Sequence, residues 1–352
     1  MLLMKKPAAT LIPTRWIFWA TILSLVLRGT ACSSVPSSSE GSTPIPSADS
    51  VVRFTSADGK TSLHGVLSVP RGNGPFASVI ILESELCEGG FPEWASGTLN
   101  SWGYATLTVD SYAGRNLAPG ACIDLTALQP ADTVGDVYGA LRVLERDPRI
   151  DANRVALLGT WDGSTTIIVA DTLEAEHRYV TGGMIAFRAF FAISPFCRIE
   201  LAGADLRPYA PERIYVGERD DMAPAAACVQ MAKFLDSEGG DVSVKVYPGA
   251  EHGFDYVPPA LVTPPMDSEA LHPHGEDFTY PLRPYYVPFA DNLAACSFRI
   301  TSISQKTTQS EVSRCVRKGV HTASDPAAAY SMQDDLEGSL ARFLSGGQRV
   351  LQ

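Results

Sequence analysis

The sequence predicts an α/β fold in which helices flank a mainly parallel sheet. Short apolar runs typical of buried strands, such as Ala77–Leu82 and Phe190–Ile193, alternate with segments whose apolar residues recur at helical spacing. The clearest helical segment, Ala131–Arg146, ends just before Pro148, because proline disfavours a helical conformation in the residue before it. Strands that alternate with helices of about ten to fifteen residues are typical of a parallel sheet covered by helices.

Composition narrows the classes of protein to which the chain could belong. Of the 352 residues, 45% are hydrophobic and 19% are charged, which is ordinary for a protein with a sizeable core. The net charge of −11 argues against nucleic acid or an anionic membrane surface as an electrostatic partner. The aromatic residues fit a core better than a cofactor site, so we predict no cofactor.

The first 31 residues are expected to be a secretory signal. Basic residues precede the apolar run Trp16–Leu27, and the small residues GTA lead to Cys32. The apolar run is shorter than the ~20 residues that span a bilayer, which disfavours an uncleaved anchor. A Ser/Pro-rich stretch, 33–50, would then be a tether. We expect an exported protein: either a periplasmic or membrane-anchored lipoprotein with a lipidated Cys32, or a secreted protein.

One domain, residues 51–345, is expected after the tether. The expected strands are Val51–Thr55, Leu63–Val69, Ala77–Leu82, Tyr104–Asp110, Val155–Leu158, Phe190–Ile193, Arg213–Val216 and Val242–Tyr247, and the first two should form an antiparallel hairpin. The expected helices are Trp94–Trp102, Ala131–Arg146, Ala223–Leu235 and Asp325–Leu344. Eight of the 25 prolines lie between Pro258 and Pro288, so residues 255–320 are expected to be an irregular insertion.

Residues 154–164 have the strand, turn and helix order of a nucleophile elbow. The pattern G-x-S-x-G is replaced there by GTWDG, so Trp161 occupies the position of the expected nucleophile. An indole cannot attack a carbonyl group. Three alternatives remain open: a site without an elbow nucleophile, a carboxylate nucleophile at Asp162, or Ser164, which would lie in the first helical turn and whose simpler role is capping.

Two later segments carry further candidate residues. The run GERDDMAP at residues 217–224 follows a predicted strand, and YPGAEHGF at residues 247–254 follows the last one. A histidine in a glycine-flanked loop at this point reaches the carboxyl edge of the sheet, where ligands of such folds bind. A carboxylate after the preceding strand can orient it, and we prefer Asp220 to Asp221 because Asp221 is placed to cap the next helix.

With the elbow, these segments resemble the dienelactone hydrolase family of α/β-hydrolases, over roughly residues 51–254 and the last helix. The resemblance implies an α/β-hydrolase fold and a hydrolase acting on a small ester or lactone. It implies Asp220 as the acid and His252 as the base. It also implies that Glu85, in ESELCEGG, takes the place of a family glutamate, and that Arg115, in DSYAGR, holds a substrate carboxylate.

The six cysteines after Cys32 make disulfides plausible in an exported chain, although sequence alone leaves many pairings open. Cys296 and Cys315 form the favoured pair, and for Cys87 a disulfide to Cys122 is favoured over a role as nucleophile. The segment His272-Pro-His274 lacks the spacing of a metal site, so no metal is predicted.

The residues therefore leave two functions open. One is an exported hydrolase that uses His252 and Asp220, tentatively with Asp162 as nucleophile. The other is a catalytically inactive binding protein that keeps the fold, with Trp161 lining the pocket together with Arg115. A small molecule is the expected ligand of both.

Overall fold

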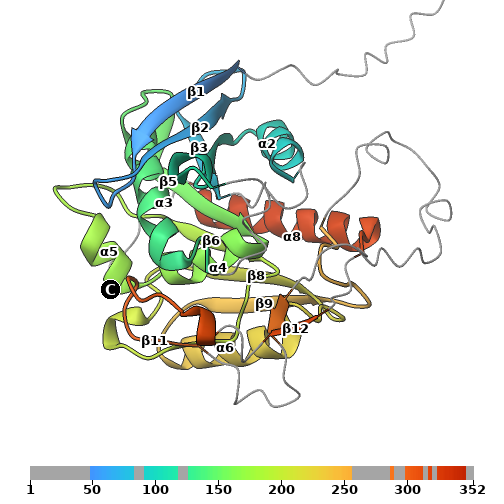
Figure 1. Cartoon of the computed structure of the whole chain (residues 1–352). Coiled ribbons are helices and arrows are strands. Elements are labelled where there is room, and N and C mark those ends of the chain that lie inside the picture. Colours follow the sequence, from blue (N-terminus) through green and yellow to red (C-terminus); the bar gives the residue numbers. More distant parts are fainter. Residues whose placement is uncertain are drawn as a thin grey trace, which may run out of the picture. The chain divides into compact units, whose positions relative to one another are not determined.

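The structure, a computed structural model, describes residues 48–82, 91–117, 126–255, 286–288, 298–311, 316–318 and 323–345. Figure 1 shows a central sheet with helices on both of its faces. In the part of the chain that is described, no helix is both long enough and apolar enough to cross a membrane. The predicted signal and Cys32 lie outside the described residues.

The central sheet has eight strands in the order β1-β2-β4-β3-β5-β6-β8-β9. Strands β1 and β2 are antiparallel to each other, β2 is antiparallel to β4, and the pairs from β4 to β9 are parallel. Their bounds are Ala48–Thr55 (β1), Ser62–Val69 (β2), Phe76–Leu82 (β3), Ala105–Asp110 (β4), Ile150–Thr160 (β5), Ala189–Ile193 (β6), Glu212–Gly217 (β8) and Val242–Tyr247 (β9). The predicted mainly parallel sheet and its antiparallel hairpin are confirmed.

Helices cover both faces of this sheet (Figure 1). Their bounds are Phe91–Ser101 (α2), Pro130–Glu145 (α3), Trp161–Ala170 (α4), Leu173–Tyr179 (α5), Ala225–Ser237 (α6) and Pro326–Leu344 (α8). Helices α3, α4, α5 and α6 contribute to one apolar core, and α2 and α8 contribute to a second core on the opposite face. Each predicted helix is present, while α5 was not expected.

The central strands have continuous apolar runs because both of their faces are buried. In β3, Val79 and Ile81 belong to the core under α2 and α8, whereas Ile80 and Leu82 belong to the other core. All five residues of β6 are fully buried. The two-residue periodicity of a strand therefore distributes one apolar run between two cores.

The described part of the predicted insertion is more ordered than expected. Strand β11 (Phe298–Ile300) pairs in parallel with β7 (Ile199–Leu201), and β10 (Tyr286–Pro288) pairs with β12 (Val316–Lys318). The segment after β11 docks on α3: Gln129, at the start of that helix, exchanges hydrogen bonds with the backbone of Thr307 at 2.7 and 2.9 Å. Sequence periodicity could not find these three-residue strands, because each depends on a partner distant in the chain.

One disulfide is described, between Cys197 and Cys228, and it joins the loop after β6 to α6. This pair was left open by the sequence. The favoured pairs Cys296–Cys315 and Cys87–Cys122 lie outside the described residues, as do His272 and His274.

Candidate active site

The carboxyl ends of the parallel strands bring the candidate residues to one edge of the sheet. The elbow follows β5, and the loops that carry Asp220 and His252 follow β8 and β9. In open α/β sheets ligands bind outside this edge, where the connections leave the strands. The site is thus built from three loops on a rigid scaffold.

Asp220 and His252 meet at this edge. Nδ1 of His252 lies 2.9 Å from Oδ2 of Asp220, and the exposed fractions of the two side chains are 3% and 0%. The other carboxylate oxygen of Asp220 accepts hydrogen bonds from the amides of Met222 and Ala223, at 3.0 and 2.6 Å. Because each oxygen of Asp220 is engaged, the carboxylate has a fixed orientation toward the imidazole.

The backbones of the two loops are tied together. The amide of Glu218 donates to the carbonyl of Tyr247 at 2.9 Å, and that of Arg219 donates to Ala250 at 2.8 Å. Gly217 is required at this crossing, since a Cβ atom there would lie 2.4 Å from the Ala250 carbonyl oxygen. The position of His252 relative to Asp220 is therefore set mainly by backbone contacts.

The His252 loop is also fixed to the start of α8. The carbonyl of His252 accepts a hydrogen bond from Ala323, and that of Phe254 accepts one from Asp325. Asp325 caps α8 through a hydrogen bond from the Ala328 amide at 3.0 Å. Gly253, with φ of 76°, provides the left-handed turn that directs the loop there. The chain at the start of the last helix thus also holds the histidine loop.

The elbow keeps its tight packing although its central residue is a tryptophan. A Cβ atom on Gly159 would lie 2.7 Å from Ile167, and one on Gly163 would lie 2.7 Å from the Leu82 carbonyl oxygen. Thr160 is extended (φ −128°, ψ 149°), and α4 begins at the next residue, Trp161. The two glycines therefore let α4 start directly above the sheet.

The structure does not assign the elbow nucleophile. The side chains of Trp161 and Asp162 are outside the described part, as is Glu85 in residues 83–90. Ser164 is described and is fully buried in the first turn of α4. The roles of Asp162, Glu85 and Trp161 accordingly stay predictions.

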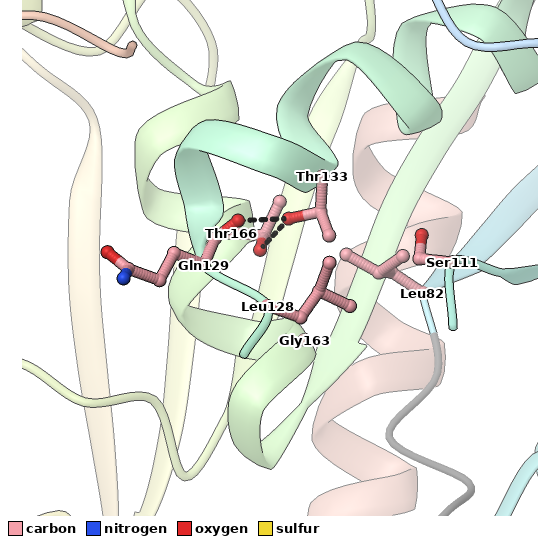
Figure 2. Close-up of a pocket in the computed structure, with 7 residues that line it drawn as sticks. All are labelled: Leu82, Ser111, Leu128, Gln129, Thr133, Gly163 and Thr166. Carbon is pink, nitrogen blue, oxygen red and sulfur yellow. Dashed lines mark hydrogen bonds between the residues drawn. The ribbon is translucent and has the colours of Figure 1, made fainter. Parts of the chain in front are cut away.

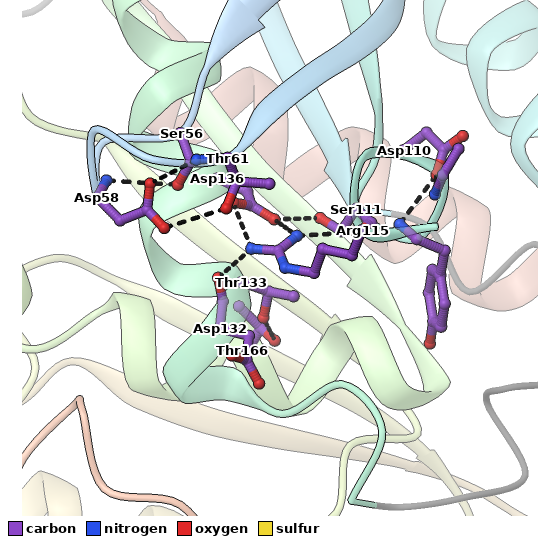
Figure 3. Close-up of polar contacts among 12 residues, drawn as sticks. Ser56, Asp58, Thr61, Asp110, Ser111, Arg115, Asp132, Thr133, Asp136 and Thr166 are labelled. Carbon is purple, nitrogen blue, oxygen red and sulfur yellow. Dashed lines mark hydrogen bonds and ion pairs between the residues drawn. The ribbon is translucent and has the colours of Figure 1, made fainter. Parts of the chain in front are cut away.

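Arg115 makes an ion pair within the fold (Figure 3). Its two terminal nitrogens lie 2.7 and 3.0 Å from the oxygens of Asp136, in α3. They also donate to the carbonyls of Ser111 and Asp132, at 2.8 and 2.7 Å. These contacts give no support to binding of a substrate carboxylate by Arg115, which stays a prediction.

Burial and charge oppose each other in this pair. Burial raises the pKa of Asp136 above its ordinary value, although hydrogen bonds from Arg115 and Ser111 act in the opposite direction. The Asp136 side chain is fully buried and that of Arg115 is 16% exposed. The pair joins the turn after β4 to α3, at the same edge of the sheet as the candidate site. Sequence analysis missed Asp136, whose place inside a helical pattern gave no signal.

A cavity of about 20 Å³ lies beside the elbow (Figure 2). Its lining residues are Leu82, Ser111, Leu128, Gln129, Thr133, Gly163 and Thr166. On its wall the hydroxyls of Thr133 and Thr166 lie 2.7 Å apart and join α3 to α4. The volume suits one water molecule and is too small for an ester substrate.

Comparison with known proteins decides the family. The model of the dienelactone hydrolase family matches residues 96–271, which is half of the chain. The chain belongs to the dienelactone hydrolase family. Family membership places it among hydrolases of the dienelactone hydrolase type, which act on ester bonds.

One of the solved structures compared shares the fold of this chain, and two others align with part of it. A dienelactone hydrolase-like promiscuous phosphotriesterase from metagenomic libraries aligns with a TM-score of 0.54 at 13% identity, over 84% of this chain and 99% of that one. A candidate dienelactone hydrolase from Klebsiella pneumoniae aligns with a TM-score of 0.47 at 18% identity, over 59% of this chain and 89% of that one. Esterase 2 of Thermogutta terrifontis aligns with a TM-score of 0.44 at 16% identity, over 58% of this chain and 85% of that one. A search of curated protein sequences gave no match.

Proposed function

We propose that the protein hydrolyses a small ester or lactone, with His252 as general base and Asp220 as the residue that orients it. The observation that carries this proposal is the buried contact of 2.9 Å between His252 Nδ1 and Asp220 Oδ2 at the carboxyl edge of the sheet. An ionised carboxylate only accepts hydrogen bonds, so it favours the tautomer with the proton on Nδ1. Nε2 is then the basic nitrogen.

This arrangement supports both steps of ester hydrolysis. Nε2 takes the proton from the attacking group, and the Asp220 carboxylate stabilises the imidazolium that forms. The first amides of α4, near Asp162, have no partner within the helix and suit a developing oxyanion, as do amides near Glu85 in the predicted site. Attack by the Asp162 carboxylate on the ester carbonyl carbon would break the bond to the alkoxide, which takes a proton from solvent, and would give a mixed anhydride with the protein that water activated by His252 then hydrolyses.

The test is a panel of p-nitrophenyl esters and lactones, assayed with residues 33–352. Wild type is compared with His252→Ala, and Asp162→Asn and Ser164→Ala are assayed beside them. We expect turnover by wild type to exceed that of His252→Ala by about 10³-fold or more on at least one substrate. Equal rates on every substrate would reject the hydrolase proposal.

The second candidate is a binding protein of the same fold that has lost catalysis. The observation that favours it is Trp161 at the position of the nucleophile in the elbow. A Trp161→Ser variant separates the two candidates. Esterase activity gained only in that variant would mean that the dyad is competent and that the natural chain lacks a nucleophile.

We also propose that the protein is exported, with Cys32 as the site of a lipid anchor. The support is the basic and apolar pattern of residues 1–31 followed by the tether 33–50. Fractionation of cells that express the full chain tests this. Wild type is expected in the membrane fraction and Cys32→Ser outside it, while equal distribution of the two would argue against lipidation.

A further inference from the structure

Ser194, the residue that follows β6, has two unusual features at the candidate site. Its φ angle is 49°, and among the described residues other than glycine only Asn116 shares a positive value. Its hydroxyl is buried, with the residue 2% exposed, and within the part of the chain that is described that hydroxyl has no hydrogen-bond partner. A buried hydroxyl without a partner and a left-handed backbone are both unfavourable, so their coincidence in one residue calls for a reason.

The neighbouring residues make the conformation of Ser194 harder to form. Pro195 follows it, and a residue before proline is favoured in extended conformations. The Ser194 amide nevertheless donates to the Tyr215 carbonyl at 2.8 Å, and the Phe196 amide donates to the Thr165 hydroxyl at 3.0 Å. These bonds fix the turn between β8 and α4. The strained geometry is thus imposed by the elements that build the candidate site.

Sheet register places Ser194 beside the elbow. Ile193 pairs with Thr160 of β5 on one side and with Tyr215 of β8 on the other. Ser194 is the next residue. At the edge of the sheet it therefore lies between the end of β5, which leads to Trp161, and β8, which leads to Asp220. Neighbouring strands are about 4.8 Å apart, which keeps these three chain positions close together.

We propose that Ser194 is the nucleophile of this chain, in place of the tryptophan-bearing elbow position. Nucleophiles of this fold are held on a sharp, strained turn at the end of a parallel strand, and Ser194 has that placement on the adjacent strand. Its residue exposure equals the 2% of His252. The inference rests on the proposed ester hydrolysis and names its nucleophile.

Acyl transfer to Ser194 and hydrolysis of the product require only Ser194, His252 and water. Ser194 Oγ attacks the ester carbonyl carbon while His252 Nε2 accepts the hydroxyl proton, and that proton then passes to the departing alcohol. The product is an acyl ester on Ser194. Water, deprotonated by the same nitrogen, hydrolyses this ester and restores the serine.

Covalent labelling tests the inference directly. A fluorophosphonate probe forms a phosphonyl ester with an activated serine and releases fluoride, and peptide mass mapping locates the adduct. With residues 33–352 we expect the adduct on Ser194, and no adduct in His252→Ala. An adduct on another residue instead would overturn the assignment.

Two variants remove the hydroxyl of Ser194, and a control variant at another serine keeps it. Ser194→Gly relieves the left-handed backbone, and Ser194→Ala keeps it, so together they separate loss of the hydroxyl from a change in folding. Both are expected to lower p-nitrophenyl ester turnover at least 100-fold, with thermal unfolding still cooperative. The control is Ser78→Ala in β3, because Ser78 also has a buried hydroxyl without a partner but lies toward the opposite end of its strand. Its turnover and labelling should equal those of wild type.

The outcomes distinguish the two proposals. If wild type exceeds His252→Ala but Ser194→Gly turns over as fast as wild type, the Ser194 assignment is wrong and ester hydrolysis stands. If wild type does not exceed His252→Ala on any ester and takes up no probe, the proposed function itself fails and the assignment fails with it.

Discussion

His252 Nδ1 lies 2.9 Å from Asp220 Oδ2, although the two residues are 32 positions apart in the chain. Hydrogen bonds between their loops, and the absence of a side chain at Gly217, bring them together. The dyad is therefore part of the folded framework. Its geometry is set by the fold before a substrate binds.

Loss of one partner of the Arg115–Asp136 pair is expected to destabilise the protein. Arg115→Met leaves a fully buried carboxylate without its counterion, and we expect the free energy of unfolding to fall by about 3–5 kcal/mol. Chemical denaturation measures this. The control is Arg149→Ala, which breaks the more exposed pair with Asp147 and should cost about 0–1 kcal/mol.

The same variant tests the predicted contact with substrate. If Arg115 binds a substrate carboxylate, Arg115→Met should raise KM while stability changes little. The pairing with Asp136 leads us to expect the opposite result: a large loss of stability, with any loss of activity following the loss of folded protein.

Glu212 at the start of β8 should make stability depend on pH. Burial raises the pKa of its carboxyl from 4.5 to about 8, with Arg213 acting in the opposite direction. The folded carboxyl keeps its proton over a pH range in which the unfolded one releases it. The free energy of unfolding should therefore fall as pH rises from about 4.5 to about 8.

Glu212→Gln should remove this contribution, because an amide does not titrate. Relative to wild type, we expect the variant to gain stability as pH rises from 5 to 8, as followed by urea unfolding at several pH values. Glu200→Gln, at an exposed position, is the control and should give a difference close to zero throughout. A Glu212→Gln difference that does not vary with pH would mean that this carboxyl titrates alike in both states.

The elbow should not tolerate a methyl group at Gly163. The Cβ atom of Gly163→Ala would lie 2.7 Å from the Leu82 carbonyl oxygen, so backbone must move. We expect a loss of about 1–3 kcal/mol in the free energy of unfolding. The control is Gly97→Ala in α2, where nothing lies within 4 Å and alanine should stabilise the helix by about 0.5–1 kcal/mol. Equal effects of the two substitutions would contradict the close packing of α4 on β3.

The site residues that could be predicted from the sequence lie in turns that directly follow a strand. Asp220 and His252 could be placed because glycine-bearing turns after two apolar runs must emerge at one edge of a parallel sheet. Ser194 could not be predicted in this way, because the local sequence predicts neither its φ angle nor the lack of a hydrogen-bond partner for its hydroxyl. Asp136 could not be predicted for a related reason. Its partner Arg115 lies on a different element, and the apolar residues around Asp136 explain the helix without it.

The fold was predictable to a similar extent and for similar reasons. The central strands are long apolar runs with turn signals, so their existence followed from local pattern. Strands β7 and β11 have three residues each and are defined by one another across a hundred positions of chain. The Cys197–Cys228 disulfide is likewise a property of the folded chain, since it joins a loop to a helix that only packing brings together.

The most direct test of the dyad compares kcat/KM for a p-nitrophenyl ester in Asp220→Asn and Asp221→Asn. Asparagine at position 220 no longer favours the tautomer with the proton on Nδ1, so we predict a loss of about 10³-fold or more. Asp221→Asn changes the neighbouring charge by the same amount and should stay within about threefold of wild type, because Asp220 makes the 2.9 Å contact with Nδ1 of His252. Equal kcat/KM values for the two variants would contradict a catalytic role for the Asp220–His252 pair.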